Sequence, residues 1–276
     1  MDLGLRGVHV LITGASGGIG METAKLFIAH GANVTLHCKS NIDPLKNLME
    51  KHGKNRVHCV MTDLYNEDAV QRIFRFSEVQ FGPVQVLIVN HAISSKGDVS
   101  LVDMTLDQWN GTLQTNLSSA FLVCREYLRG LQEPKVTPEL KEQVSIVLIG
   151  STAGKYGEAG NADYAASKSA MMYGLTMTLK NEIVKIAPKG RVNCVAPGWV
   201  DTPMAADALQ NPKVMYQALA TTPLKKIATP RDIANQIAIL TSSAVSGHVT
   251  GQVVMVEGGM EGRAINTPEE IEALKL

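Results

Sequence analysis

A tyrosine and a lysine stand one helical turn apart in the segment Tyr164-Ala-Ala-Ser-Lys168. On a helix, side chains at positions i and i+4 lie on the same face, so the Lys168 ammonium would lie beside the Tyr164 phenol. A free tyrosine has a pKa of about 10 and is a poor proton shuttle at neutral pH, but a nearby positive charge lowers that pKa. We therefore expect Tyr164 to act as a general acid and general base.

A serine hydroxyl is placed where it could assist this chemistry. Ser151 directly follows the apolar run 144–150, which is predicted to be a strand. Ligands of open parallel sheets bind at the carboxyl ends of the strands, and there Ser151 could donate a hydrogen bond to a substrate oxygen as charge develops on it. Taken singly, a surface Tyr–Lys pair and an N-cap serine are commoner than catalytic groups. Their coincidence with a cofactor motif favours catalysis.

That motif is a glycine-rich segment, Thr13-Gly-Ala-Ser-Gly-Gly-Ile-Gly20, between a predicted strand and a predicted helix. Glycine lets the backbone turn tightly and approach a pyrophosphate, while the helix N-terminus supplies free N–H groups and a positive dipole. An isolated glycine cluster would indicate an ordinary turn, but the order strand, turn, helix predicts dinucleotide binding. The predicted contacts are Gly14, Ser16, Gly18, Ile19 and Gly20.

The end of the second predicted strand, His37-Cys38-Lys39-Ser40, bears on which dinucleotide is bound. An acid about 20 residues after the glycines would hold the ribose 2′-hydroxyl of NAD, whereas a basic residue accommodates the 2′-phosphate of NADP. No acid follows this strand until Asp43, and Lys39 offers a cation beside the Ser40 hydroxyl. We predict NADP(H), with His37, Lys39 and Ser40 among its contacts. The alternatives are that Lys39 is a solvated loop lysine and that NAD(H) is used.

The order of these motifs resembles the short-chain dehydrogenase/reductase family over residues 8–259, and its 3-oxoacyl reductase branch most of all. The matching motifs are TGASGGIG at 13–20, Asp63-Leu64, NHA at 90–92, Asn116, Ser151, Tyr164 to Lys168, and PGWVDTPM at 197–204. The resemblance implies an oxidoreductase that moves a hydride between the nicotinamide and a carbonyl or secondary alcohol. Ketone reduction is the implied direction if NADPH is the cofactor.

The resemblance also implies cofactor contacts outside the glycine turn. These are Asp63 to the adenine amino group, Leu64 to the adenine ring, Asn90 and Ala92 along the cofactor path, and Pro197, Gly198, Val200 and Thr202 around the nicotinamide carboxamide. Lys168 would also hold the nicotinamide ribose. Asn116 would complete the catalytic set by retaining a water that links Lys168 to solvent.

Two positions depart from the family pattern. The family commonly has NNAG where this chain has Asn90-His91-Ala92-Ile93, so a β-branched side chain replaces a glycine near the nicotinamide ribose. Many NADP-using members also carry arginine in the glycine turn, at the position of Gly17 here. The first departure alters the expected pocket shape, and the second removes one expected phosphate contact.

Apolar β-rich runs alternate with longer amphipathic segments along the chain. This alternation predicts an α/β, Rossmann-like, doubly wound seven-stranded parallel sheet with helices on both faces, in a single domain spanning residues 1–276. The predicted strands are 8–13, 33–38, 56–61, 84–89, 144–150, 191–196 and 252–257. The longest predicted helices are 106–131 and 162–186, and the segment 133–143, with two prolines, is predicted to be an exposed loop.

Nothing in the sequence names the substrate. Residues 201–229 are predicted to form a mobile cover over the site. The candidate residues of the substrate pocket are His91, Tyr156, Trp199 and Met204. Core packing is the equal alternative for the aromatic and methionine side chains. Residues 261–276 extend past the usual C-terminal end of family members. A subunit contact and a disordered end would both fit this segment.

Composition indicates a globular protein, since 45% of the 276 residues are hydrophobic and 19% are charged. Lysine plus arginine equals aspartate plus glutamate at 26 each, which argues against a nucleic-acid or anionic-membrane partner. No apolar stretch approaches the roughly 18 residues of a membrane-spanning helix, and no signal peptide is expected. We therefore expect a cytoplasmic protein that acts on a small carbonyl or alcohol substrate.

The cysteines predict reduced, mostly buried thiols and no metal site, because they are widely spaced and lack accompanying histidines. They are Cys38, Cys59, Cys124 and Cys194. The family resemblance implies a homotetramer or homodimer that pairs through the two longest helices. A non-catalytic dinucleotide sensor and a sugar-nucleotide epimerase are the alternatives. The intact Ser151, Tyr164 and Lys168 disfavour the first, and the lack of a longer C-terminal substrate domain disfavours the second.

Overall fold

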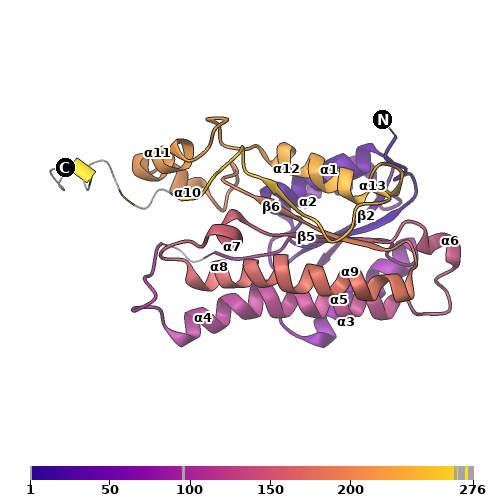
Figure 1. Ribbon diagram of the computed structural model, residues 1–276. Helices are drawn as coiled ribbons and strands as arrows, with labels where there is room; N and C mark the ends of the chain where they lie inside the picture. Colours follow the sequence, from indigo (N-terminus) through magenta and orange to yellow (C-terminus); the bar gives the residue numbers. More distant parts are fainter. Residues whose placement is uncertain (1, 95–96, 264–265, 267–270, 273–276) are drawn as a thin grey trace.

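A parallel sheet of seven strands forms the centre of the molecule, in the order β3-β2-β1-β4-β5-β6-β7 (Figure 1). The computed structural model describes residues 2–94, 97–263, 266 and 271–272. The strands are β1 (His9–Ile12), β2 (Asn33–Cys38), β3 (Val57–Met61), β4 (Val86–Val89), β5 (Ser145–Ile149), β6 (Arg191–Pro197) and β7 (Val253–Val256). Each lies within its predicted range, apart from Pro197 at the end of β6. The predicted α/β fold class is confirmed.

The sheet is covered on both faces, which explains why its central strands are mostly apolar. Every residue of β1, β4, β5 and β6 is buried. One face carries α3 (Glu67–Phe81), α4 (Leu106–Leu113), α5 (Ser119–Gly130), α8 (Ala162–Ser169) and α9 (Thr176–Ile186) (Figure 1). The other carries α1 (Gly18–Ala29), α2 (Asp43–His52), α12 (Pro230–Thr241) and α13 (Ser243–Ser246). Two apolar cores result, one on each face of the sheet.

The strand order determines where a ligand can bind. The chain adds β2 and then β3 on one side of β1, and afterwards returns to place β4 on the other side. The direction in which strands are added reverses between β1 and β4, and ligands of open α/β sheets bind at the carboxyl ends of the strands at such a switch point. The glycine turn follows β1 at this point.

Both long predicted helices contain a π-helical turn. The range 106–131 comprises α4, the π-helical η1 (Gln114–Ser118) and α5, while 162–186 comprises α8, the π-helical η2 (Ala170–Leu175) and α9. A π-helical turn inserts one extra residue per turn and is frequent near functional sites. Asn116 lies in the first of these turns. Periodicity predicted the helices but not this local change of pitch.

The prediction that 133–143 is an exposed loop is partly wrong. The segment contains a single helical turn, α6 (Pro138–Lys141), in which Thr137 accepts a hydrogen bond from the Leu140 N–H. Proline is well tolerated in the first turn of a helix, because the N–H that it lacks has no partner there. Val136 is buried against the core and anchors the segment.

The remaining short helices gather at one end of the molecule. They are α7 (Thr152–Tyr156), α10 (Ala206–Leu209) and α11 (Pro212–Ala220). The last two belong to the predicted cover, 201–229, and lie at the same end as α7 (Figure 1). The predicted extension 261–276 lies outside the described residues except for 261–263, 266 and 271–272. None of the helices in the described part of the chain has the length and hydropathy of a membrane-spanning segment.

Candidate active site

Ser151 lies two residues after the end of β5 and directly precedes α7. Its Oγ accepts a hydrogen bond from the Ala153 N–H at 3.1 Å, so the side chain is an N-cap. The same hydroxyl is hydrogen-bonded to the Tyr164 phenol. The helix-capping and catalytic roles are therefore compatible, because capping fixes the position from which Ser151 meets Tyr164.

Tyr164 and Lys168 share one face of α8, as their spacing predicts. The Lys168 Nζ lies 5.6 Å from the centre of the Tyr164 ring. It also donates a hydrogen bond of 2.7 Å to the Ile149 carbonyl oxygen. Ile149 is the last residue of β5, so Lys168 ties α8 to the strand that leads to Ser151. The three predicted catalytic side chains are thereby brought together.

Burial sets the protonation of this centre. It raises the pKa of Tyr164 to about 12, and the hydrogen bond from Ser151 offsets this only in part. It lowers the pKa of Lys168 to about 8. The sequence-based expectation of a lowered pKa for Tyr164 had the wrong sign for the protein itself, since it counted charges and left out desolvation. At neutral pH the phenol holds its proton and is suited to act as an acid.

Asn116 is buried and braces the site. Its amide accepts from the Ile93 N–H at 2.8 Å and donates to the Ile93 carbonyl oxygen at 2.9 Å. It also donates to the Ser167 Oγ at 3.2 Å. These bonds connect the π-helical turn to the segment after β4 and to α8. The water-holding role implied by the family stays a prediction.

Close approach between backbones explains two glycines of the predicted pyrophosphate turn. Gly14 has φ +62°, and a Cβ there would lie 2.8 Å from the His91 Cα. A Cβ on Gly20 would lie 2.5 Å from the Gly14 carbonyl oxygen. At Gly18 a Cβ would meet the Thr202 side chain at 2.8 Å. The turn is thus held between the segments after β4 and β6, and three distant motifs meet at one place.

Asn90 shapes this turn from the end of β4. Its Nδ2 donates to the carbonyl oxygens of Thr13 and Gly14, at 3.2 and 2.9 Å. The Asn90 N–H donates to the Thr13 Oγ1 at 3.0 Å. Thr13 was not among the predicted site residues. A hydroxyl directly before the glycines is the only signal that sequence offers for it.

His91 is a neutral clamp between two elements. Its Nδ1 lies 2.7 Å from the Thr13 Oγ1, and its Nε2 lies 2.7 Å from the Ser119 Oγ. Because the Ser119 hydroxyl donates to the Thr115 carbonyl oxygen, it accepts from the Nε2–H of His91. The Nδ1 then accepts the Thr13 hydroxyl proton, for which the Ile88 carbonyl oxygen at 3.2 Å is the alternative acceptor. Burial lowers the pKa of His91 to about 3, which agrees with a neutral ring.

His37 braces the turn from β2. Its Nδ1 accepts a hydrogen bond from the Gly14 N–H at 3.2 Å, and its Nε2 donates to the Thr62 carbonyl oxygen at 2.9 Å. The side chain is buried, and burial lowers its pKa. Both ring nitrogens thus have partners within the protein. The predicted contact of His37 with a dinucleotide stays a prediction.

Lys39 and Asp63, both predicted to contact the adenosine part of the cofactor, form an ion pair. The Lys39 Nζ lies 2.9 Å from the Asp63 Oδ2, and both side chains are more than half exposed. Such an exposed pair contributes little to stability, so either partner can exchange it for a ligand contact at low cost. Leu64 follows Asp63 but is buried in the core. Ser40 is exposed beside Lys39.

The predicted nicotinamide segment leaves β6 and folds back. Val200 is buried and forms an isolated parallel bridge with Ala228, so the two ends of the predicted cover lie together. Pro197 is buried at the end of the strand, and a Cβ on Gly198 would lie 3.0 Å from the Glu257 Cβ. Ala92 is half-buried beside His91. The cofactor contacts of these residues stay predictions.

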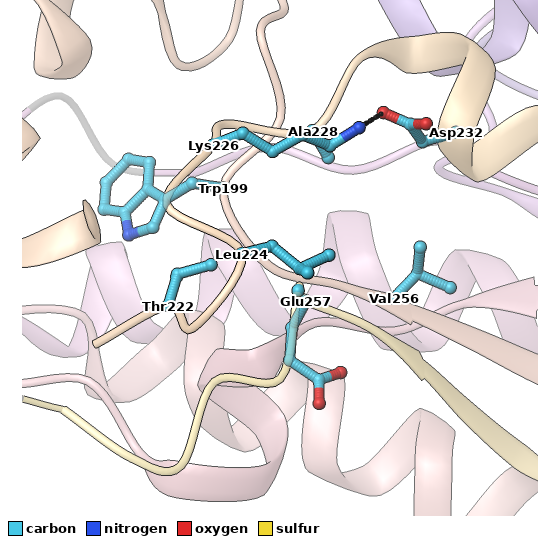
Figure 2. A pocket seen from close by; sticks show the side chains of 9 residues that line it. Trp199, Thr222, Leu224, Lys226, Ala228, Asp232, Val256 and Glu257 are labelled. Atoms are coloured by element: carbon cyan, nitrogen blue, oxygen red, sulfur yellow. Dashed lines mark hydrogen bonds and ion pairs between the residues drawn. The ribbon is translucent and has the colours of Figure 1, made fainter. Parts of the chain in front are cut away.

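A cavity of about 130 Å³ lies beneath this fold-back, next to the ends of β6 and β7 (Figure 2). Its walls include Trp199 and Leu224, and the Lys226–Asp232 ion pair crosses its rim (Figure 2). Ser151, Tyr164 and Lys168 do not line it. Of the candidate pocket residues, Trp199 faces this cavity, Met204 is exposed, and the Tyr156 hydroxyl donates to the Met260 carbonyl oxygen at 2.6 Å.

One buried acid beside the centre was missed from the sequence. The carboxylate of Asp163 accepts from the Thr112 hydroxyl at 2.7 Å and from the Tyr164 N–H at 2.8 Å. It therefore couples α4 to the first turn of α8. Its only sequence signal is an acid near a helix N-terminus, which is common on solvent-exposed helices.

Comparison with known proteins agrees with this architecture. A family model described as enoyl-(acyl carrier protein) reductase matches residues 14–261. The chain is 33% identical to a 3-oxoacyl-[acyl-carrier-protein] reductase of Chlamydia muridarum, over 91% of this chain and 96% of the relative. A reductase of the same description from Vibrio cholerae is 32% identical, over 94% of this chain and 99% of the relative.

A solved structure is similar as well. A protein from Brucella melitensis, described as a short-chain dehydrogenase/reductase and glucose/ribitol dehydrogenase, matches with a TM-score of 0.82 and 32% identity. The match covers 94% of this chain and 98% of that one. The chain belongs to the short-chain dehydrogenase/reductase family. It is an oxidoreductase that transfers a hydride between a nicotinamide dinucleotide and a carbonyl or alcohol, as predicted.

Proposed function

We propose that this protein reduces the ketone of 3-oxoacyl thioesters with NADPH, with Tyr164 as the general acid. The observation that carries the proposal is the buried hydrogen bond between Ser151 and a phenol whose pKa is raised. With this pKa the phenol keeps its proton at neutral pH, which is the form that a general acid for ketone reduction needs. The 3-oxoacyl reductases among the relatives suggest the substrate class.

The residues fit a bound dinucleotide. The backbone of Gly14 and Gly20 leaves no room for side chains, and α1 begins directly behind the turn, so free N–H groups face the expected pyrophosphate. When bound, the reduced nicotinamide supplies the hydride to the carbonyl carbon. Ser151 donates a hydrogen bond to the carbonyl oxygen as it gains negative charge, and Tyr164 gives it a proton. Lys168 holds the ribose and stabilises the phenolate that remains.

Lys39 would select NADPH over NADH by pairing with the 2′-phosphate in place of Asp63. Titrating the protein with each cofactor, followed by nicotinamide fluorescence, tests this. Wild-type protein should bind NADPH more tightly, and Lys39→Ala should lose about tenfold of that preference, since one charge-assisted contact contributes roughly 1.5 kcal/mol or more. Equal binding of both cofactors by wild-type protein would contradict the NADP(H) assignment.

Reduction of an enoyl double bond is a second candidate, because the matching family model carries that description. Assays with a 3-oxoacyl and a 2-enoyl thioester of the same chain length separate the two. We expect NADPH consumption with the 3-oxoacyl thioester. Turnover of the enoyl thioester alone would replace the proposed function. Binding of NADPH without turnover of any carbonyl would favour the non-catalytic sensor.

Several broader features also remain proposals. The segment 201–229, with α10 and α11 at the same end as α7, would cover the bound substrate. The protein would form a homotetramer or homodimer through α4–α5 and α8–α9. A cytoplasmic location is supported by free thiols at Cys38, Cys59, Cys124 and Cys194.

A further inference from the structure

An ion pair from two distant segments lies beside the catalytic centre. The Arg263 Nη1 is 3.1 Å from the Glu158 Oε1, and fewer than a quarter of each side chain is exposed. The Arg263 Nη2 lies 3.5 Å from the Oγ1 of Thr152, the residue after Ser151. Arg263 follows β7, whereas Glu158 follows α7. The segment after β7 thus reaches the segment that begins with the catalytic serine.

The charges of this pair act on the reacting phenol. The Arg263 charge lowers the pKa of Tyr164 and the Glu158 charge raises it, so the pair lies close enough to act electrostatically on the phenol. Asp98 adds a second negative charge near this pair: its Oδ1 accepts from the Asn161 Nδ2 at 3.0 Å, and its charge raises the pKa of Glu158.

Arg263 retains donor capacity. Its Nε is buried and has no hydrogen-bond partner within the described part of the chain. The same holds for Arg56, Arg125 and Arg191, but among these four arginines only Arg263 acts on Tyr164. A buried N–H without an acceptor costs about 1–3 kcal/mol, and a ligand oxygen would remove that cost.

We propose that Arg263 is a specificity-determining residue that binds the C1 carbonyl oxygen of a 3-oxoacyl substrate, while Ser151 and Tyr164 hold the C3 oxygen. This inference rests on the proposed function. The two carbonyl groups of a 3-oxoacyl group are separated by one methylene carbon. A second donor next to Ser151 can therefore reach the C1 oxygen while the C3 oxygen is bound by Tyr164. The guanidinium offers several donors in one plane, which suits a carbonyl oxygen.

The charge balance favours a neutral acyl group over a free acid. A thioester or ester oxygen can accept from Arg263 while Glu158 keeps its ion pair. A substrate carboxylate would instead have to displace Glu158 and approach Asp98, and like charges at close range oppose this. We therefore expect esters and thioesters to be reduced more efficiently than the corresponding 3-oxo acids.

The experiment compares ethyl 3-oxobutanoate with 2-heptanone, a ketone with an equally long main chain and no C1 carbonyl. Wild-type protein should have the higher kcat/KM on the ester. Arg263→Met should lower kcat/KM on the ester by about ten- to a hundredfold more than on the simple ketone, as for a lost hydrogen bond to a charged group. The effect of the removed charge on Tyr164 is common to both substrates. Arg263→Lys should fall between wild type and Arg263→Met. Retained reduction of 2-heptanone shows that the variant is folded.

Arg231→Met is the matched control. Arg231 pairs with Glu22 at 3.0 Å on α12 and α1, so the variant removes an arginine–glutamate pair away from Tyr164. It should keep the wild-type preference. Glu158→Gln should raise kcat/KM on 3-oxobutanoate several-fold, because the competing carboxylate is gone.

The outcomes separate this inference from the proposed function. Full retention of the ester preference by Arg263→Met, or an equal loss on both ketones, overturns the role of Arg263 while the proposed function stands. Wild-type protein that reduces 2-heptanone but no 3-oxoacyl ester or thioester contradicts the proposed function and with it this inference.

Discussion

Desolvation and hydrogen bonding compete at the Tyr164 phenol. Burial raises its pKa, and the hydrogen bond with Ser151 lowers the pKa by less than burial raises it. Burial lowers the pKa of Lys168, because desolvation penalises the charged ammonium. At neutral pH the Tyr164 phenol therefore keeps its proton and Lys168 is mostly in the ammonium form, which are the states that the proposed general-acid mechanism needs.

Tyr164→Phe tests the acid directly. We expect NADPH to bind with nearly unchanged affinity, since the hydroxyl alone is removed, while kcat falls by about 10²- to 10⁴-fold. Fluorescence titration and steady-state reduction of a 3-oxoacyl thioester measure the two effects. Activity close to wild type would contradict the assignment of Tyr164.

The pH profile reports on Lys168. Its pKa of about 8 lies below the ordinary lysine value, so the ammonium is present below pH 8 and is lost as the pH rises above it. Because the charged form would hold the nicotinamide ribose, kcat/KM for NADPH should be level below about pH 8 and fall above it. Lys168→Arg, which stays charged, should lack this fall. A level profile to pH 10 in wild-type protein would exclude this role for Lys168.

At the scale of the element, the glycine turn depends on three other segments. Asn90 and His91 hold it from the end of β4, His37 holds it from β2, and Thr202 packs against Gly18. Each contact is short and involves backbone atoms of the turn or their immediate neighbours. The turn is therefore shaped before a dinucleotide binds, which lowers the ordering cost of binding.

Two alanine substitutions distinguish its glycines. At Gly20 a Cβ would lie 2.5 Å from the Gly14 carbonyl oxygen, so Gly20→Ala should cost about 1–3 kcal/mol of unfolding free energy and weaken NADPH binding. Gly17 is exposed, has φ −78°, and would bring its Cβ no closer than 3.4 Å to that oxygen. Gly17→Ala is the control and should change neither quantity measurably. Urea denaturation and fluorescence titration measure both, and equal effects would contradict this account of the turn.

At the scale of the whole molecule, the two long helical segments present apolar side chains to the outside. The exposed members are Leu106, Phe121, Tyr173 and Val184. They come from α4, α5, η2 and α9, which lie on one face of the sheet (Figure 1). A face of this kind fits an isologous contact between copies of the chain.

A charge on this face should separate the subunits. Phe121→Glu is expected to convert the oligomer to smaller species, because an unpaired carboxylate would be buried in the contact. Light scattering coupled to size-exclusion chromatography measures the mass. Phe76→Glu is the control, since Phe76 is comparably exposed but lies on α3, outside the two long helical segments that are expected to pair. A monomeric wild-type protein, or an unchanged mass for Phe121→Glu, would contradict the predicted assembly through these helices.

The sequence by itself determined the α/β fold class, the glycine turn and the Tyr164–Lys168 pair. These depend on local patterns: apolar runs of strand length, glycines directly after a strand, and two side chains one helical turn apart. Such patterns involve residues that are close together in the chain, so they can be recognised without knowing which other segments pack against those residues. The family's motif order then linked them into one site.

Only the tertiary structure decided the sign of the Tyr164 pKa shift, the clamp that His91 forms between Thr13 and Ser119, and the meeting of Arg263 with Glu158. Desolvation depends on everything that surrounds a group, and no periodicity encodes it. Contacts between residues far apart in the chain likewise arise from how the layers pack. The sequence therefore predicted which groups perform the chemistry, and packing determined their protonation and which charges lie beside them.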